Sequence, residues 1–75
     1  MAERDLWYGE ANQCRHVATR LSNQAMRLSK VADRLEDDRA EVLATAARYA
    51  EGMAQAESLL ALQVEIWAAG EHSNG

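Results

Sequence analysis

A seven-residue repeat runs through both halves of the chain and limits it to long α-helices packed side by side. Residues seven apart lie on one face of a helix, so each repeat marks a continuous row. The first half has a row of large residues beside a row of alanines: Trp7, Cys14, Leu21, Leu28 and Leu35 beside Ala11, Ala18, Ala25 and Ala32. The second half has the same pattern of two rows, with Ala46, Met53, Leu60 and Trp67 beside Ala47, Ala54, Ala61 and Ala68. Both halves therefore predict helices with an apolar, alanine-lined face.

The helix boundaries follow from the residues that can stop or start a helix. Proline is absent and the glycines are few, so nothing inside either half forces a break. Asp38 can cap a new helix, with Glu41 reaching back as a capping box, and Gly70 suits a C-terminal cap. The sequence predicts one domain over 1–75, with helices at about 4–35 and 39–69, a turn at about 36–38 and a mobile tail at 70–75.

Alanine rows let two helix backbones approach closely, which favours antiparallel packing across the central turn. The large rows balance about position 37, pairing Trp7 with Trp67 and Cys14 with Leu60. We therefore predict an all-α fold, an antiparallel two-helix hairpin of alanine-rich coiled-coil type. Helices of about 30 residues would form a rod about 45 Å long.

The apolar faces are wider than one helix pair can cover, which predicts association. A chain of 75 residues buries only about 60% of its unfolded surface when it folds alone. One cysteine and no Cys/His cluster leave it without an internal disulfide or a structural metal site. Dimerisation of two hairpins into a four-helix bundle would cover both faces. The residues predicted for the dimer or partner interface are Leu59, Leu62, Ile66, Trp67, Trp7, Met53 and Leu60.

Polar residues interrupt the apolar faces at Glu10, Gln24 and Glu57. Buried polar groups cost stability unless they are partnered, and single ones often fix the register of a coiled coil. Glu57 and Gln24 are therefore either register residues or contacts for a ligand or partner. Cys14 lies in the large apolar row, where burial suppresses the reactive thiolate and predicts a structural role.

A basic stripe, Arg20, Arg27 and Arg34, runs along the edge of the first apolar face. One interpretation pairs it with acids of the second helix such as Glu41 and Glu51. The other lets it grip phosphates of RNA or another anionic ligand. A dimer of such hairpins resembles in shape the plasmid regulator Rop, a hairpin dimer that binds RNA. The resemblance implies RNA binding for the architecture, and it assigns no residue roles here.

The net charge of -4 disfavours general binding to nucleic acid or anionic membranes. The first residues lack the apolar segment of a secretory signal and no run of about 20 apolar residues is present, so we expect a cytoplasmic protein without a membrane span. The abundance of Arg and Ala suits a bacterial or phage origin. No constellation for catalysis, no metal motif and no cofactor motif is present, so we expect no enzyme and no cofactor.

These observations predict a small protein-protein interaction module. It would be a homodimeric helical bundle that acts as an adaptor, regulator or inhibitor of a larger protein. Two alternatives remain open at this stage. The chain is an obligate subunit of a hetero-assembly, or it binds RNA or an anionic ligand through the arginine stripe.

Overall fold

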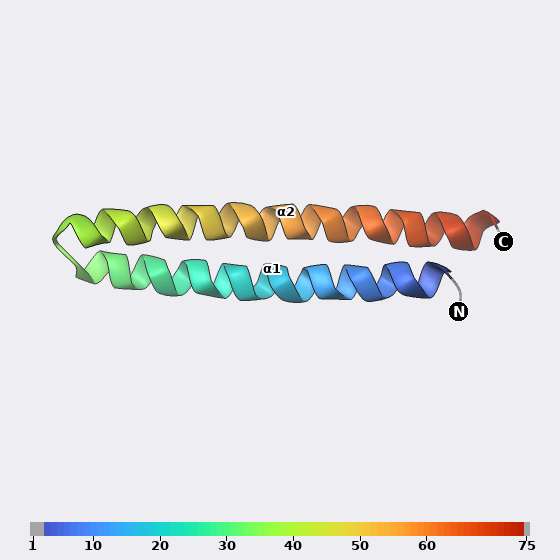
Figure 1. The fold of residues 1–75 in the computed structure, drawn as a ribbon, viewed down its shortest axis with the longest axis horizontal. Helices are drawn as coiled ribbons and strands as arrows, with labels where there is room; N and C mark the ends of the chain where they lie inside the picture. The colour runs from blue at the N-terminus through green and yellow to red at the C-terminus, as the bar shows by residue number, and fades with distance from the viewer. Residues whose placement is uncertain (1–2, 75) are drawn as a thin grey trace.

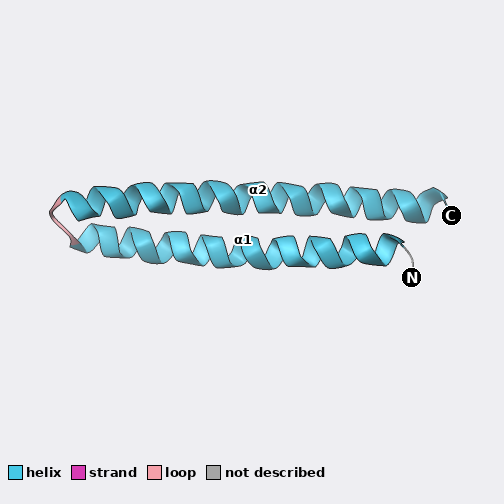
Figure 2. Ribbon diagram, viewed as in Figure 1, coloured by secondary structure: helices cyan, strands magenta, loops and turns pink. Residues whose placement is uncertain are grey.

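Two long helices lie antiparallel and contact each other along their length (Figure 1). The computed structural model describes the backbone of residues 3–74 and the side chains of residues 3–70. Helix α1 spans Glu3–Arg34 and helix α2 spans Asp38–Asn74. Figure 2 shows helix and one short connection, with no strand in the part of the chain that is described. The predicted all-α antiparallel hairpin is confirmed.

Helix α2 is longer than the sequence predicts. It continues through Gly70 and ends at Asn74, whereas the predicted end was near Ala69. Gly70 has no positive φ, so it does not form a left-handed C-terminal cap. The rod is consequently 59 Å long rather than about 45 Å. The mobility predicted for residues 70–75 stays a prediction, and Gly75 lies outside the described residues.

The connection between the helices is capped by Asp37. Helix α1 ends at Arg34, and the Leu35 amide still donates to the Ala32 carbonyl at 3.1 Å. The Asp37 carboxylate accepts the amide N–H of Arg39 at 3.0 Å, which is the bond that an N-cap side chain makes to the second helical residue. The turn therefore occupies residues 35–37, one position earlier than predicted.

The predicted cap at Asp38 with Glu41 as its capping box is wrong. Asp38 is already the first residue of α2, so its backbone is helical and the capping position belongs to the residue before it. The Arg39 guanidinium also bonds the Asp37 carboxylate, with 2.9 Å between Nη2 and Oδ2. These hydrogen bonds from the side chain and then the backbone of Arg39 lower the pKa of Asp37.

The seam between the helices is built from small residues. The buried apolar set is Ala11, Cys14, Ala18, Ala25, Ala32, Ala47, Ala50, Ala54, Ala61, Val64 and Ala68. Ala61 and Ala68 have no exposed surface, and no large side chain is fully buried among the described residues. The predicted role of the two alanine rows is therefore confirmed. The narrow seam also explains why little of the remaining apolar surface is covered.

The large residues of α1 and α2 contribute unequally to the seam. In α1, Trp7 and Leu28 are half-buried against the two core clusters. In α2, Met53 and Leu60 are exposed, and the predicted pairing of Cys14 with Leu60 stays a prediction. Cys14 clusters with Ala61, the residue after Leu60. Small residues of α2 pack in the seam because the large side chains of α1 already fill the space beside the contact.

The two tryptophans meet at the open end of the hairpin, as predicted. The ring centroids of Trp7 and Trp67 are 5.6 Å apart, with an interplanar angle of 62°. This is the edge-to-face geometry that aromatic pairs favour. No helix in the described part of the chain is both long and apolar enough to cross a membrane.

Candidate interaction surfaces

The seam divides the outer surface of the hairpin into two long sides. An ion pair crosses the seam on one of them, where Nη2 of Arg15 donates to Oε1 of Glu65. Residues seven apart share a face, so the rows that contain Arg15 and Glu65 both border this side. We call it the serine side, after Ser22, Ser29 and Ser58, which occupy those two rows.

The opposite side carries the basic stripe. Its α1 row holds Glu3, Glu10, Val17, Gln24 and Val31, and its α2 row holds Ala46, Met53, Leu60 and Trp67. These rows lie directly before the buried alanine rows in sequence, whereas Arg15 and Glu65 lie in rows on the other flank. The stripe Arg20, Arg27 and Arg34 borders the α1 row on its outer edge. We call this surface the arginine side.

A shallow hollow on the arginine side brings together three of the predicted polar contacts. It has a volume of about 340 Å³ and is lined by Val17, Arg20, Leu21, Gln24 and Arg27. Arg34 lies in the same row, one repeat nearer the turn. Glu57 does not line the hollow.

Among the residues that the structure describes, the arginines of the stripe form no ion pair with an acid of the hairpin. Neither the Arg15–Glu65 pair nor the Arg39–Asp37 pair involves them. Glu51 lines hollows on the serine side, away from the stripe. The predicted pairing of the stripe with Glu41 and Glu51 is therefore wrong. The three guanidinium groups are exposed and available to groups outside the hairpin.

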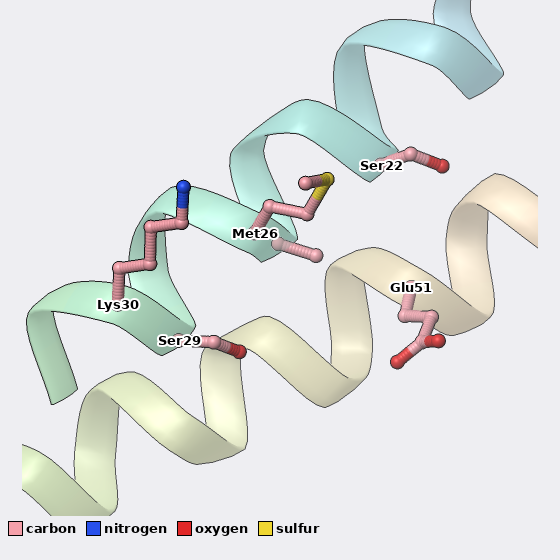
Figure 3. Close-up of a pocket in the computed structure, with 6 residues that line it drawn as sticks. Ser22, Met26, Ser29, Lys30 and Glu51 are labelled. Carbon is pink, nitrogen blue, oxygen red and sulfur yellow. The ribbon is translucent and has the colours of Figure 1, made fainter. Parts of the chain in front are cut away.

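The serine side is a shallow groove with apolar edges. Figure 3 shows Ser22, Met26 and Ser29 of α1 and Glu51 of α2 around a hollow of about 510 Å³. A neighbouring hollow of about 500 Å³ is bordered by Ser58, Leu59 and Leu62. Small residues at seven-residue spacing let the backbone of another helix approach closely. The groove is therefore shallow, with small residues along it and apolar side chains on part of its border.

The predicted interface residues do not form a single surface. Met53, Leu60 and Trp67 belong to the arginine side, while Leu59 and Leu62 border the serine side. Ile66 shares the row of Leu59 and is also exposed. Trp7 is half-buried against the core cluster and contacts Trp67. The hairpin thus presents two apolar surfaces, and the tryptophan pair belongs partly to its own core.

The predicted polar interruptions differ in position. Glu57 is half-buried in the seam, where burial and then the Glu57 carboxylate raise the pKa of the Cys14 thiol. Gln24 and Glu10 are exposed on the arginine side. Glu57 is thus placed as a register residue would be, and Gln24 is placed where a partner could reach it.

Cys14 has the environment of a structural residue. Its side chain is buried in the seam. Burial raises the pKa of the Cys14 thiol, and so do the hydrogen bond to Glu57 and the negative charges of Glu57 and Glu10. These effects disfavour the thiolate, which is the nucleophilic form. Among the residues that the structure describes, no group of His, Cys, Asp and Glu could hold a metal ion.

Comparisons with known proteins identify no relative. No protein-family model matches the chain. The curated proteins and the solved structures likewise give no match. The functional argument therefore rests on the surfaces described above.

Several surface residues were not predicted from the sequence. Val17, Val31 and Tyr49 expose apolar surface, and Ser22 and Ser58 line the groove. The serines occupy the seven-residue rows beside the seam, and this spacing was a signal that could have identified the groove. Serine is also an ordinary residue on a solvated helix face, so this spacing is not specific for a groove.

Proposed function

We propose that this chain is a non-enzymatic protein-protein interaction module. Two copies form a four-helix bundle, and the bundle acts as an adaptor, regulator or inhibitor of a larger protein. The observation that carries the proposal is the amount of apolar surface that one hairpin leaves in water.

The accessible surface is too large for a chain of this mass. A compact monomer of 8.3 kDa has about 4,600 Å² of accessible surface by size scaling, whereas the hairpin exposes 5753 Å². The surplus is about 1,200 Å², more than the roughly 800 Å² that each partner buries in a standard interface. Pairing with a second hairpin would remove this surplus from water.

The exposed apolar residues are distributed around α2 rather than confined to one stripe. Leu60 on the arginine side is 45% exposed, and Leu59, bordering the serine side, is 67% exposed. A helix that is apolar around its circumference is characteristic of a buried position. One apolar side would bind the second copy, and the other would remain for a helix of the partner protein. This division supports an adaptor or inhibitor rather than a self-contained bundle.

Sedimentation equilibrium from nanomolar to high micromolar concentration tests the homodimer. We expect a species of about 16.6 kDa, twice the mass of the chain. The melting temperature should rise with protein concentration, because folded chains dimerise and unfolded chains do not. A compact, cooperatively melting 8.3 kDa monomer at all concentrations would refute the proposal. A disordered monomer would instead favour the obligate subunit of a hetero-assembly.

Matched variants on the serine side test the adaptor role. Leu62→Lys places a charge at the edge of the groove, and Gln55→Lys places the same charge nearby on an already polar residue. In affinity capture from host lysate, a specific partner should be retained by wild type and Gln55→Lys and lost with Leu62→Lys. The dimer mass should be the same for all three proteins.

RNA or anionic-ligand binding is a second candidate, because the stripe is exposed and forms no ion pair with the acids that the structure describes. The acidic net charge of -4 opposes it. Titration of RNA at two salt concentrations tests it, since phosphate contacts weaken steeply with added salt. Substitution of Arg20, Arg27 and Arg34 by Gln should abolish such binding while leaving the helix content unchanged.

A further inference from the structure

The charges on the arginine side are separated along the length of the hairpin. Arg20, Arg27 and Arg34 lie in the half nearer the turn, and Glu3 and Glu10 lie near the open end. All five side chains are exposed, and no ion pair within the described hairpin joins the two groups. One end of this side is therefore basic and the other acidic.

The α2 half of the same side is apolar and uncharged. Met53 and Trp67 are exposed in the row that borders the seam. The next row outward holds Val42, Tyr49, Ala56 and Gln63, none of which is charged. An occupant of this side must therefore present acidic groups along α1 and apolar groups along α2.

We infer that the occupant is a second copy of this chain, bound through the arginine side with the two hairpins antiparallel. In this arrangement α1 lies along α1 of the copy, and α2 lies along α2. The inference rests on the proposed homodimer and adds the surface, the direction and the register. A two-fold axis between positions 18 and 19 of α1 sets Arg27 opposite Glu10 and Arg34 opposite Glu3. Each pair occurs twice because the interface is symmetric.

The same axis also fits α2. Cys14 lies beside Ala61 in one core cluster, and Ala25 lies beside Ala50 in the other. At this register an axis between positions 18 and 19 of α1 passes between positions 56 and 57 of α2. It then sets Met53 opposite Leu60 of the copy and puts the small Ala46 opposite the large Trp67. Charge pairing on α1 and size pairing on α2 therefore require one and the same axis.

A parallel arrangement of the hairpins lacks this complementarity. It would set α1 against α2 of the copy, with both turns at one end. The arginine stripe would then face the row of Val42 and Tyr49, which contains no acid. Burying arginines without acidic partners is costly. The antiparallel dimer gives acidic partners to Arg27 and Arg34 and places Arg20 opposite Val17. The parallel dimer gives none of the three an acid, so the charge distribution favours the antiparallel dimer.

Charge reversal tests the register. Arg27→Glu and Glu10→Arg each place like charges opposite one another twice in the dimer. Each should raise the dissociation constant of the dimer about tenfold or more at low salt. The double variant restores opposite charges and should return to within about threefold of wild type. Arg48→Glu is the matched control, because it changes the net charge equally from a row outside the arginine side, and it should have little effect.

A cysteine pair tests the same register without charge. In a Cys14→Ser background, Met53→Cys with Leu60→Cys should give a disulfide-linked dimer under mild oxidation. Within one helix these positions are about 10.5 Å apart along the axis, too far for an internal disulfide. Circular dichroism should show wild-type helix content for every variant compared.

The outcomes separate this inference from the proposed function. A wild-type dimer that resists Arg27→Glu and forms no disulfide would overturn the inference while leaving the homodimer in place. Absence of any dimer would overturn both. If Arg27→Glu left the dimer constant unchanged but abolished binding to an RNA oligonucleotide, the stripe would serve RNA and the inference would be wrong.

Discussion

Glu57 on α2 and Cys14 on α1 both lie in the seam, where burial and then the Glu57 carboxylate, by hydrogen bonding and by its charge, raise the pKa of the Cys14 thiol. The pair places the polar interruption of the α2 seam opposite the single cysteine of the chain. It gives Glu57 a hydrogen-bond partner, which a carboxylate between alanine rows requires. The reactivity of the Cys14 thiol therefore reports whether Glu57 lies beside it in the seam.

Alkylation of Cys14 should follow a pKa above the ordinary thiol value of 9.0, because burial and then Glu57 favour the neutral form. Glu57→Gln should move the apparent pKa down toward 9.0 without reaching it, since burial is the larger cause. The measurement is the rate of iodoacetamide reaction against pH under native conditions. Glu10→Gln is the control and should move the apparent pKa less, because Glu10 acts by charge alone.

The raised pKa of Cys14 also determines how the stability of the protein depends on pH. A raised pKa in the folded state means that the folded protein holds the proton more tightly than the unfolded chain. The stabilisation from the protonated Cys14 thiol is complete below the pKa of the unfolded chain, near 9.0, and is lost as pH rises through the pKa of the folded protein. Cys14→Ser should remove this alkaline loss of stability. An alkylation profile that is identical in wild type and Glu57→Gln would show that the seam contact is absent.

The Asp37 cap should decide where α2 begins. Asp37→Ala removes the acceptor for the Arg39 amide and should lower the melting temperature by about 4 to 8 °C. Asp38→Ala should cost less, because Asp38 lies inside the helix and acts only through its charge near the N-terminus. Equal losses from the two variants would contradict the assignment of Asp37 as the cap. Thermal melts by circular dichroism provide the measurement.

Acid should weaken the same cap. The pKa of Asp37 lies below its ordinary value of 3.8 because Arg39 bonds the ionised carboxylate. The stabilisation is therefore complete above 3.8 and is lost as pH falls through the lower folded pKa. The difference in melting temperature between wild type and Asp37→Ala should shrink over that acidic range.

Gly52 should be replaceable by alanine with a gain in stability. It lies inside α2, has no positive φ, and a Cβ added there would meet no atom within 4 Å of it. Gly52→Ala should therefore raise the free energy of unfolding by about 0.5 to 1 kcal/mol. Gly52→Pro at the same position should lower it by about 3 kcal/mol, since proline removes a helix hydrogen bond. Urea denaturation measures both, and a loss with alanine would reveal a close contact made in the bundle.

The hairpin itself was predictable because its signals are local. Proline is absent, the seven-residue repeat is continuous within each half, and acidic residues mark the turn between the halves. The burial of the alanine rows and the contact of Trp7 with Trp67 followed from the same rows. The cap was misplaced by one residue because Asp37 and Asp38 are both good capping residues, and only the backbone path selects between them.

The composition of the seam could not be predicted fully, for a geometric reason. Two rows lie on the same flank of the alanine row of α2: the row of Met53 and Leu60 lies farther round the helix, and the row of Ala50 and Val64 lies directly beside the alanines. Either could face α1, and the larger side chains suggested the first. Close backbone approach selects the second. That choice also decides which α2 residues border each side of the hairpin, so the two surfaces are defined only by the structure.

The final prediction concerns the closeness of the two helices at Ala61. This residue has no exposed surface and lies in a cluster with Ala11, Cys14 and Val64. Ala61→Leu adds three carbons where no space exists, so the helices must separate or the side chain must adopt a strained rotamer. Overpacking of this kind should lower the free energy of unfolding by about 1 to 3 kcal/mol.

Ala69→Leu is the matched control, because Ala69 is exposed on the same helix. It should change the free energy of unfolding by less than about 0.5 kcal/mol. Urea denaturation of both variants at one protein concentration separates packing from association. If Ala61→Leu were as stable as Ala69→Leu, the seam would have room for a leucine. The backbones would then lie farther apart than an alanine seam requires, and the surplus of accessible surface would need another explanation.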